Sequence, residues 1–236
     1  MQQINRLSIL PFGMINSYVI RGAKKHVLVD AGLPDSEKQI LQQLQLLGLS
    51  LKDIGLLVIT HGHIDHFGSA NALSKALDVP ILVHENDAPA LSTGKSLVAT
   101  LKPTQAYWNL LKWKLSADTA TPVVPDLILR ADEVFSLKEF GIAGSVIHTP
   151  GHTPGSLSIV LDNGEAIIMD LASSGIFLGG ILCRSRMKHP PFHHDKSLVK
   201  HSIHQLLAKN TETFYLGHGY PVNRKLLLHY AETMLG

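Results

Sequence analysis

Short apolar runs recur along the chain, and each is followed by polar or turn-forming residues. Runs of this kind, rich in Val, Ile and Leu, are typical of buried strands. The first two runs are close enough in sequence to form a hairpin. We therefore expect strands at residues 17–21, 26–30, 56–59, 81–83, 146–149, 156–161, 166–169 and 214–216.

Helices are predicted where apolar residues recur every three or four positions. Residues 35–47 show this spacing after an acidic start, with apolar side chains at Ile40, Leu41, Leu44 and Leu47. Further helices are expected at residues 68–77, 196–209 and 223–234, with Asp195 or Ser197 as the cap of the second. The chain has no internal repeat and no low-complexity linker, so we expect a single α/β domain at residues 1–236.

Residues 92–126 separate the earlier predicted strands from the later ones and contain both tryptophans. Within them, residues 105–115 could form a helix that presents Tyr107, Trp108, Leu111 and Leu115. Such a helix could pack flat on the core, or it could be a lid or wall that gives a site an apolar pocket. A dimer contact is the third option, because exposed aromatic residues often mark interfaces.

Composition excludes several classes of protein. Hydrophobic residues make up 45% of the chain, and 21 Lys and Arg against 19 Asp and Glu give a net charge of +2. This charge is too close to neutral to indicate bulk nucleic-acid binding, and no apolar run is long enough to span a membrane. Cys183 is the only cysteine, so no intrachain disulfide forms, and we expect a small buried residue in a cytoplasmic protein.

Four side chains that can bind a metal follow directly after the run at residues 56–59: His61, His63, Asp65 and His66. In an extended chain two residues that are two positions apart point to the same face, as His61 and His63 would. Asp65 and His66 come after the turn and can face a second position nearby. One short loop could therefore supply ligands to two neighbouring metal ions.

The same arrangement recurs three times downstream. His152 lies in a loop rich in Gly and Pro after one apolar run, Asp170 ends the run at residues 166–169, and His218 stands between two glycines after residues 214–216. The remaining histidines are weaker candidates. We expect no metal role for His84, His148, His201, His204 and His229, whereas His189, His193 and His194 either line the mouth of a site or belong to a polar loop broken by prolines.

These motifs, in this order from Asp30 to His218, resemble the metallo-β-lactamase superfamily of metallo-hydrolases. The resemblance implies a four-layer αββα sandwich with two metal ions at one edge of the sheets. It implies one ion held by His61, His63 and His152, a second held by Asp65, His66 and His218, and Asp170 as the bridge. Asp30 would orient a ligand imidazole. In the family the bridging Asp usually follows Gly, whereas Met169 precedes it here.

The expected chemistry is hydrolysis by a hydroxide that bridges the two divalent ions, most simply Zn²⁺, with iron or manganese as alternatives. Asp65 and Asp170 would fix the hydroxide and accept its proton. An Asp at position 170 resembles the glyoxalase II, lactonase and phosphodiesterase branches more than the true β-lactamases. We expect an ester, thioester or lactone as the small-molecule substrate. A phosphodiesterase, a mono-iron sulfur dioxygenase and a non-catalytic scaffold are the alternatives.

Overall fold

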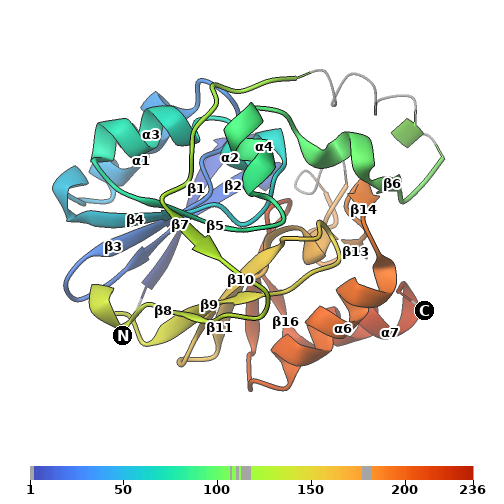
Figure 1. Cartoon of the computed structure of the whole chain (residues 1–236). Coiled ribbons are helices and arrows are strands. Elements are labelled where there is room, and N and C mark those ends of the chain that lie inside the picture. The colour runs from blue at the N-terminus through green and yellow to red at the C-terminus, as the bar shows by residue number, and fades with distance from the viewer. Residues whose placement is uncertain (1–2, 107, 110–111, 113–117, 177–181, 236) are drawn as a thin grey trace.

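The computed structural model describes residues 3–106, 108–109, 112, 118–176 and 182–235. In this part of the chain two six-stranded sheets face each other, and helices cover the outer face of each, which is the expected αββα arrangement (Figure 1). The first sheet consists, in spatial order, of β1 (Gln3–Leu10), β2 (Ile15–Arg21), β3 (His26–Val29), β4 (Ile54–Val58), β5 (Ile81–His84) and β7 (Leu127–Leu129). The second consists of β16 (Val222–Asn223), β15 (Thr213–Tyr215), β11 (Glu165–Ile167), β10 (Leu157–Leu161), β9 (Gly144–His148) and β8 (Phe135–Ser136).

Strands β3 and β4 show why the sheets stack. Successive side chains of a strand point to opposite faces. Val27 and Val29 therefore lie in the core between the two sheets, whereas Leu28 packs under the helices on the outer face. Both faces are covered, so these strands are apolar at nearly every position.

Helices α1 (Glu37–Leu46), α2 (Ile64–Phe67), α3 (Ala70–Leu77) and α4 (Ala88–Thr93) lie on the side of the first sheet. Helices α6 (Lys196–Leu207) and α7 (Arg224–Thr233) cover the second sheet. Asp195 caps α6 by accepting hydrogen bonds from the backbone amides of Ser197 and Leu198. The expected cap at Asp195 is thus confirmed, and Asn223 caps α7 in the same way.

Short elements complete the described chain. Two small sheets pair β12 (Ser173–Ser174) with β13 (Met187–Lys188) and β14 (Phe192–His193) with β6 (Lys102–Pro103). Single turns of 3-10 helix are η1 (Pro11–Gly13), η2 (Leu51–Asp53), η3 (Leu97–Thr100), η4 (Lys138–Phe140) and η5 (Met169–Leu171). The last of these ends the strand expected at residues 166–169 early, because Met169 adopts a φ of 41° and turns the chain.

The segment at residues 92–126 is described only in part. Tyr107, Leu111 and Leu115, on which the expected helix depends, lie outside the described residues. Trp108 packs near Phe192 of β14, with ring centroids 6.3 Å apart, and Val98 belongs to the same small apolar cluster. The segment therefore contacts β14, and its role as a lid or wall stays a prediction.

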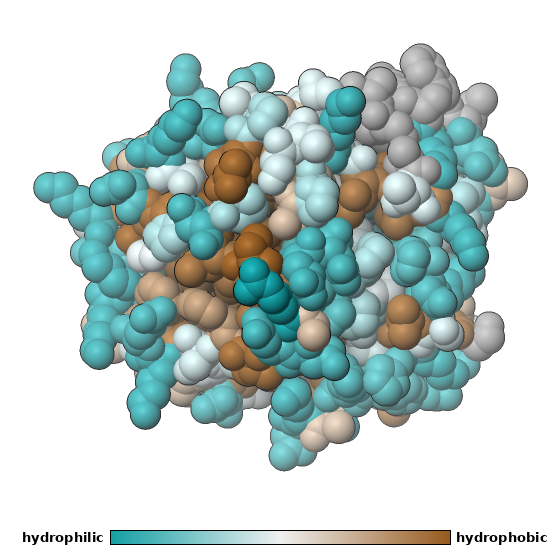
Figure 2. Space-filling model, in the orientation of Figure 1, coloured by the Kyte–Doolittle hydropathy of each residue, from teal (hydrophilic) through white to brown (hydrophobic). Residues whose placement is uncertain are grey.

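Polar side chains cover most of the face in Figure 2, with apolar side chains between them near its centre. Cys183 is exposed, so the expectation that it is buried was wrong, and it lies in a tight turn closed by a hydrogen bond from Arg186 N to its carbonyl oxygen. Among the described helices, none has the length and apolar character that a membrane crossing requires.

Candidate metal centre

The loop after β4 is held at the edge where parallel strands end. Strand β4 pairs in parallel with β3 and β5, so the segments that follow these three strands meet at one edge of the sheet. Asp30 follows β3, and its carboxylate accepts hydrogen bonds from Thr60 N and Thr60 Oγ1, both at 2.7 Å. The start of the histidine-rich loop is thus fixed by a buried carboxylate from the neighbouring strand.

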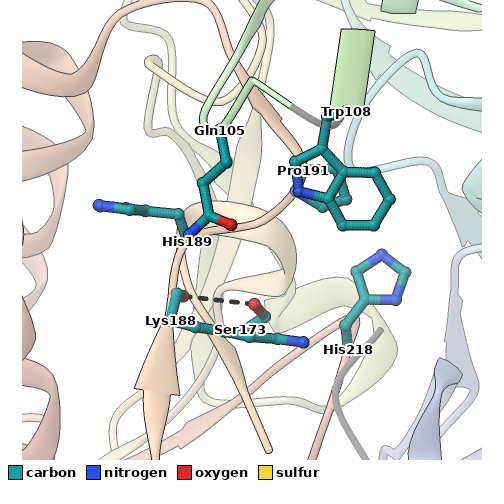
Figure 3. A pocket seen from close by; sticks show the side chains of 7 residues that line it. All are labelled: Gln105, Trp108, Ser173, Lys188, His189, Pro191 and His218. Carbon is teal, nitrogen blue, oxygen red and sulfur yellow. Dashed lines mark hydrogen bonds between the residues drawn. The ribbon is translucent and has the colours of Figure 1, made fainter. Parts of the chain in front are cut away.

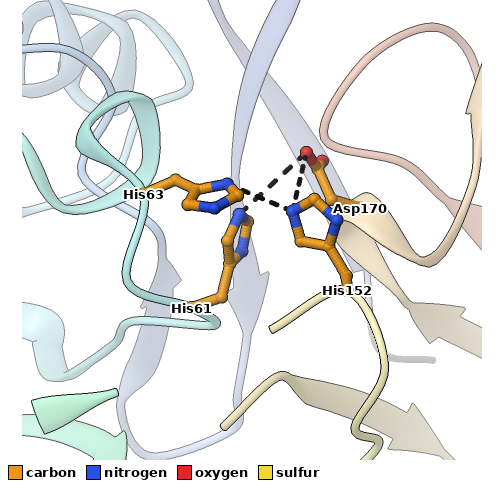
Figure 4. Close-up of side chains that lie close together, drawn as sticks. All are labelled: His61, His63, His152 and Asp170. Carbon is orange, nitrogen blue, oxygen red and sulfur yellow. Dashed lines mark hydrogen bonds and ion pairs between the residues drawn. The ribbon is translucent and has the colours of Figure 1, made fainter. Parts of the chain in front are cut away.

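His61, His63, His152 and Asp170 form the first group, and all four are buried. They offer ligand atoms that lie within 4.8 Å of one another. Figure 4 shows the three imidazoles and the carboxylate directed toward a common centre. His152 Nε2 lies 3.1 Å from His63 Nδ1 and 3.5 Å from Asp170 Oδ2.

Asp65, His66 and His218 form the second group, within the same 4.8 Å limit. His218 Nε2 lies 3.4 Å from Asp65 Oδ2 and 3.1 Å from Asp170 Oδ2. His66 Nε2 lies 3.7 Å from Asp170 Oδ1. The Asp170 carboxylate therefore stands between the two groups, and all seven side chains that were expected at a metal centre come together.

The outward nitrogens of two of the imidazoles are held by other groups. His66 Nδ1 donates a hydrogen bond to Asp30 Oδ2 at 2.7 Å. Asp30 thus contacts a candidate ligand imidazole, as the sequence analysis expected. His218 Nδ1 donates to the Met14 carbonyl at 2.5 Å. Such outer partners fix the tautomer of a ligand imidazole and direct its other nitrogen toward a metal.

Several of the inward atoms have no hydrogen-bond partner among the described residues. These atoms are buried and unpartnered, and they include Nε2 of His61, Nε2 of His66 and Oδ1 of Asp170. Buried polar atoms without partners are rare and costly, so several at one point indicate a missing bound group. Imidazole nitrogens and carboxylate oxygens are donors that suit zinc, iron and manganese, so these residues fit a metal centre.

Burial and charge set the protonation of the group. Burial lowers the pKa of His61 and His152 well below the usual value and that of His63 to about 4. These imidazoles are neutral at pH 7, which is the form that binds metals. Burial also acts on His66, but the carboxylates around it, that of Asp65 foremost, raise its pKa to about 10. A metal ion at this position would have to displace a proton.

Asp87 is a supporting residue that the sequence analysis missed. It is fully buried and accepts hydrogen bonds from Gly62 N at 2.7 Å, Gly155 N at 2.8 Å and Thr153 Oγ1 at 2.6 Å. One carboxylate thus ties the loop of His61 and His63 to the loop of His152. Its signal was an acid shortly after the strand at residues 81–83, which resembles the pattern used for Asp170.

His193 was also underestimated. It lies in β14 and is buried, and its Nδ1 is 3.3 Å from His152 Nδ1. The expectation of a polar loop holds for exposed His194 but not for His193. His84 and His148 lie outside the two groups, and their rings stack with centroids 3.9 Å apart. His201, His204 and His229 are exposed.

A cavity of about 250 Å³, open to solvent, adjoins the seven side chains. His63, Asp65, His152, Asp170 and His218 form one side of it. Its other walls are mainly apolar, with contributions from Leu10, Ile15, Leu33, Ile64, Val98 and Phe192. A mostly apolar cavity with a few convergent polar groups is typical of a small-molecule site.

Comparison with known proteins supports this assignment. The chain is 30% identical over 214 residues to the probable metallo-hydrolase YflN of Bacillus subtilis, covering 84% of this chain and 77% of that protein. It is 27% identical to the probable metallo-hydrolase MJ0888 of Methanocaldococcus jannaschii, covering 93% and 94%.

Solved structures share the fold. The BLEG-1 B3 metallo-beta-lactamase has a TM-score of 0.69 at 22% identity, with 99% of this chain and 100% of that chain covered. ST1585 from Sulfolobus tokodaii, an archaeal metallo-beta-lactamase superfamily protein, has a TM-score of 0.67 at 18% identity, with 100% of this chain and 87% of that chain covered. The family model described as "Metallo-beta-lactamase superfamily" matches residues 10–218, which include every side chain of the two groups. The chain therefore belongs to the metallo-β-lactamase superfamily.

Proposed function

We propose that this protein is a binuclear metal-dependent hydrolase that cleaves an ester, thioester or lactone bond. The observation that carries the proposal is the position of Asp170, whose carboxylate lies within 4 Å of imidazole nitrogens from both groups. A carboxylate in this position can bind two ions at once, which favours two metals over one.

His61, His63 and His152 would hold the first ion, Asp65, His66 and His218 the second, and Asp170 both. We expect zinc, which nitrogen and oxygen donors suit, and the same donors make iron and manganese the alternatives. When bound, such a pair lowers the pKa of a shared water to about 7 and polarises the electrophile.

Two acids have different tasks in this scheme. Burial raises the pKa of Asp170, but the surrounding imidazoles, that of His218 foremost, more than offset this and lower it well below its usual value. Asp170 is therefore a fixed negative charge that orients the attacking water. Asp65 is the more accessible acid, with 23% of its side chain exposed, and it lines the cavity. It is placed to accept the proton of that water and to pass it to solvent.

The cavity supports an acyl substrate. Its apolar walls match the hydrocarbon part of an ester, thioester or lactone better than a charged phosphodiester backbone. A relative from Haemophilus influenzae that is 29% identical over 139 residues, 58% of this chain, is named hydroxyacylglutathione hydrolase GloC. That name denotes hydrolysis of a thioester and supports the same class of bond here.

Metal content and turnover test the proposal together. Protein loaded with zinc should contain two ions per chain and should hydrolyse thioesters or lactones. Chelation should abolish turnover, and Asp65→Asn should lower kcat/KM by about 100-fold or more, a typical loss for a proton acceptor. His229→Gln, at an exposed helix position, is the control variant. Equal turnover by chelated and metal-loaded protein would contradict the mechanism.

The same panel separates the alternatives. Faster turnover of bis-p-nitrophenyl phosphate than of any acyl compound would identify a phosphodiesterase. A single iron per chain with oxygen uptake on a persulfide would identify a sulfur dioxygenase. Two bound ions without turnover of any probe would favour a scaffold.

A further inference from the structure

The loop that carries His218 depends on other segments for its course. It runs from Leu216 to Gly219, between β15 and β16, and glycine stands on both sides of His218. The His218 imidazole stands out from this loop at one side of a small recess (Figure 3). Gly217 lies so close to the bridging carboxylate that a Cβ at this position would overlap Asp170 Oδ1. Contacts from elsewhere must therefore fix the direction of the imidazole.

Asn16 supplies such contacts from the first sheet. It is the second residue of β2, and its side chain is fully buried. Its Nδ2 donates hydrogen bonds to the carbonyls at the two ends of the loop, those of Gly219 at 2.9 Å and Leu216 at 3.1 Å. A longer bond of 3.3 Å joins the same nitrogen to the Gly13 carbonyl. Three carbonyl oxygens thus surround Nδ2, and they determine the orientation of the amide because its oxygen would be repelled there.

The backbone around Asn16 completes the contact with the loop. Asn16 N donates to the Gly217 carbonyl at 3.0 Å, and the Met14 carbonyl accepts the hydrogen bond from His218 Nδ1. Residues 14–16 therefore contact every residue of the loop. In this arrangement His218 Nε2 is directed toward the second ligand group.

The amide of Asn16 does more than fill space. Among the described residues, only its Nδ2 donates to the Gly219 carbonyl, which belongs to a buried residue. Its Oδ1, by contrast, is buried without a hydrogen-bond partner in the described part of the chain, and such an atom costs free energy. An apolar side chain would avoid this cost. The hydrogen bonds donated on both sides of His218 are therefore what the amide provides.

We propose that Asn16 is a positioning residue for the second metal ion. Its amide holds the loop so that His218 Nε2 faces Asp65 Oδ2 at 3.4 Å and Asp170 Oδ2 at 3.1 Å. Without the amide the Gly219 end of the loop is released, and the imidazole has no single direction. Affinity for the second ion then falls, whereas the ligands of the first ion keep their places. This inference rests on the proposed function, which includes the second ion.

Zinc binding to Asn16→Ala tests the inference. Competition with a chelator of known affinity gives the number of bound ions and the affinity for each. Affinity for the second ion should fall by about 10- to 100-fold, the usual loss when an outer partner of a metal ligand is removed. Affinity for the first ion should stay at the wild-type value. An equal loss at both ions, or no loss at either, would overturn the inference.

Ser17→Ala is the matched control. Ser17 is the next residue of β2 and is equally buried, but its hydroxyl has no hydrogen-bond partner among the described residues. Its removal should leave both affinities unchanged. Asn16→Ser is the second variant, since its short hydroxyl cannot reach both ends of the loop, and the same selective loss is expected. If neither Asn16 variant folds, Asn16 stabilises the fold as a whole and the inference is wrong.

Failure of the proposed function would look different, because the wild-type protein would then bind fewer than two ions. Hydrogen exchange of the metal-free proteins decides the matter in that case. The Gly219 amide, which donates to the Gly13 carbonyl at 2.7 Å, should exchange about 10- to 100-fold faster in Asn16→Ala than in the wild type. The amides of β4 report global unfolding and should change less. Equal exchange rates at Gly219 would rule out a positioning role for Asn16.

Discussion

Met169 is the residue at which this chain departs from the pattern of its family. Glycine usually stands before the bridging acid, and Met169 has a φ of 41°, a conformation that glycine adopts without steric cost. The Met169 side chain is buried between the two sheets. The core contact of a large side chain therefore compensates for an unfavourable backbone at the residue that positions Asp170.

Two substitutions separate these contributions. Met169→Ala should lower the free energy of unfolding by about 2–5 kcal/mol through the lost core contact. Met169→Gly loses the same contact but relieves the backbone, so it should be more stable than Met169→Ala by about 1 kcal/mol. Urea unfolding of both variants measures the difference. A glycine variant less stable than the alanine variant would show that the backbone is unstrained.

His193 is expected to act through His152. When His152 Nε2 faces a metal, its Nδ1 carries the proton and donates to His193 Nδ1 at 3.3 Å. His193→Phe removes this acceptor and should weaken binding of the first ion by about 10- to 100-fold. Competition with a chelator of known affinity measures the loss.

His194→Phe is the matched control, because the neighbouring imidazole is exposed. His193→Asn, which retains an acceptor, should restore part of the affinity. Unchanged affinity in His193→Phe would show that His152 needs no partner.

Residue chemistry made the seven metal-centre side chains predictable, because each follows an apolar run and the ends of strands converge. The roles of His193 and Asp87 were not predicted, and the reason is physical. Their roles depend on which loops touch: His193 lies 41 positions from its partner His152, and Asp87 lies 68 positions from Gly155. Sequence spacing does not report such contacts.

Among the elements, strands β3 and β4 were predictable because both faces are apolar, whereas β7 and β8 were not. These have three and two residues, and they owe their extended conformation to pairing with β5 and β9. The helix expected at residues 68–77 is α3, preceded by the short α2 that contains Asp65 and His66. Tertiary contacts therefore determine these short elements.

Asp87 connects the two loops of the first ligand group. Asp87→Ala leaves the amides of Gly62 and Gly155 without an acceptor, which should lower the free energy of unfolding by about 2–5 kcal/mol. Because the loops then separate more easily, affinity for the first ion should fall as well. Asp53→Ala, which removes an exposed carboxylate near the other end of β4, should change neither quantity. A destabilised variant with normal metal affinity would limit Asp87 to a structural role.

At the scale of the molecule, the metal centre joins the two sheets. The loop after β4 supplies His61, His63, Asp65 and His66 from the first sheet. Segments of the second sheet supply His152, Asp170 and His218. Hydrogen bonds also cross this edge, such as the 2.7 Å bond from the Tyr18 hydroxyl to the Leu216 carbonyl and the 2.8 Å bond from Leu157 N to Thr60 O. Bound ions would thus cross-link the sheets where they meet.

Metal removal should therefore destabilise the whole fold. Ligands that bind only the folded state add RT ln(1 + [L]/Kd), about 4 kcal/mol at a free concentration of 1,000 Kd. The Tm of a chain of this size changes by about 2–4 °C per kcal/mol of stability. Chelation should therefore lower Tm by about 8–16 °C per ion released. Asp170→Asn should reduce this shift more than Asp65→Asn does, because Asp170 contacts both groups and Asp65 only one. Scanning calorimetry measures these changes in Tm. Equal changes in the two variants would mean that Asp170 binds one ion only. Identical Tm values for chelated and metal-loaded wild-type protein would mean that the sheets are joined without metal.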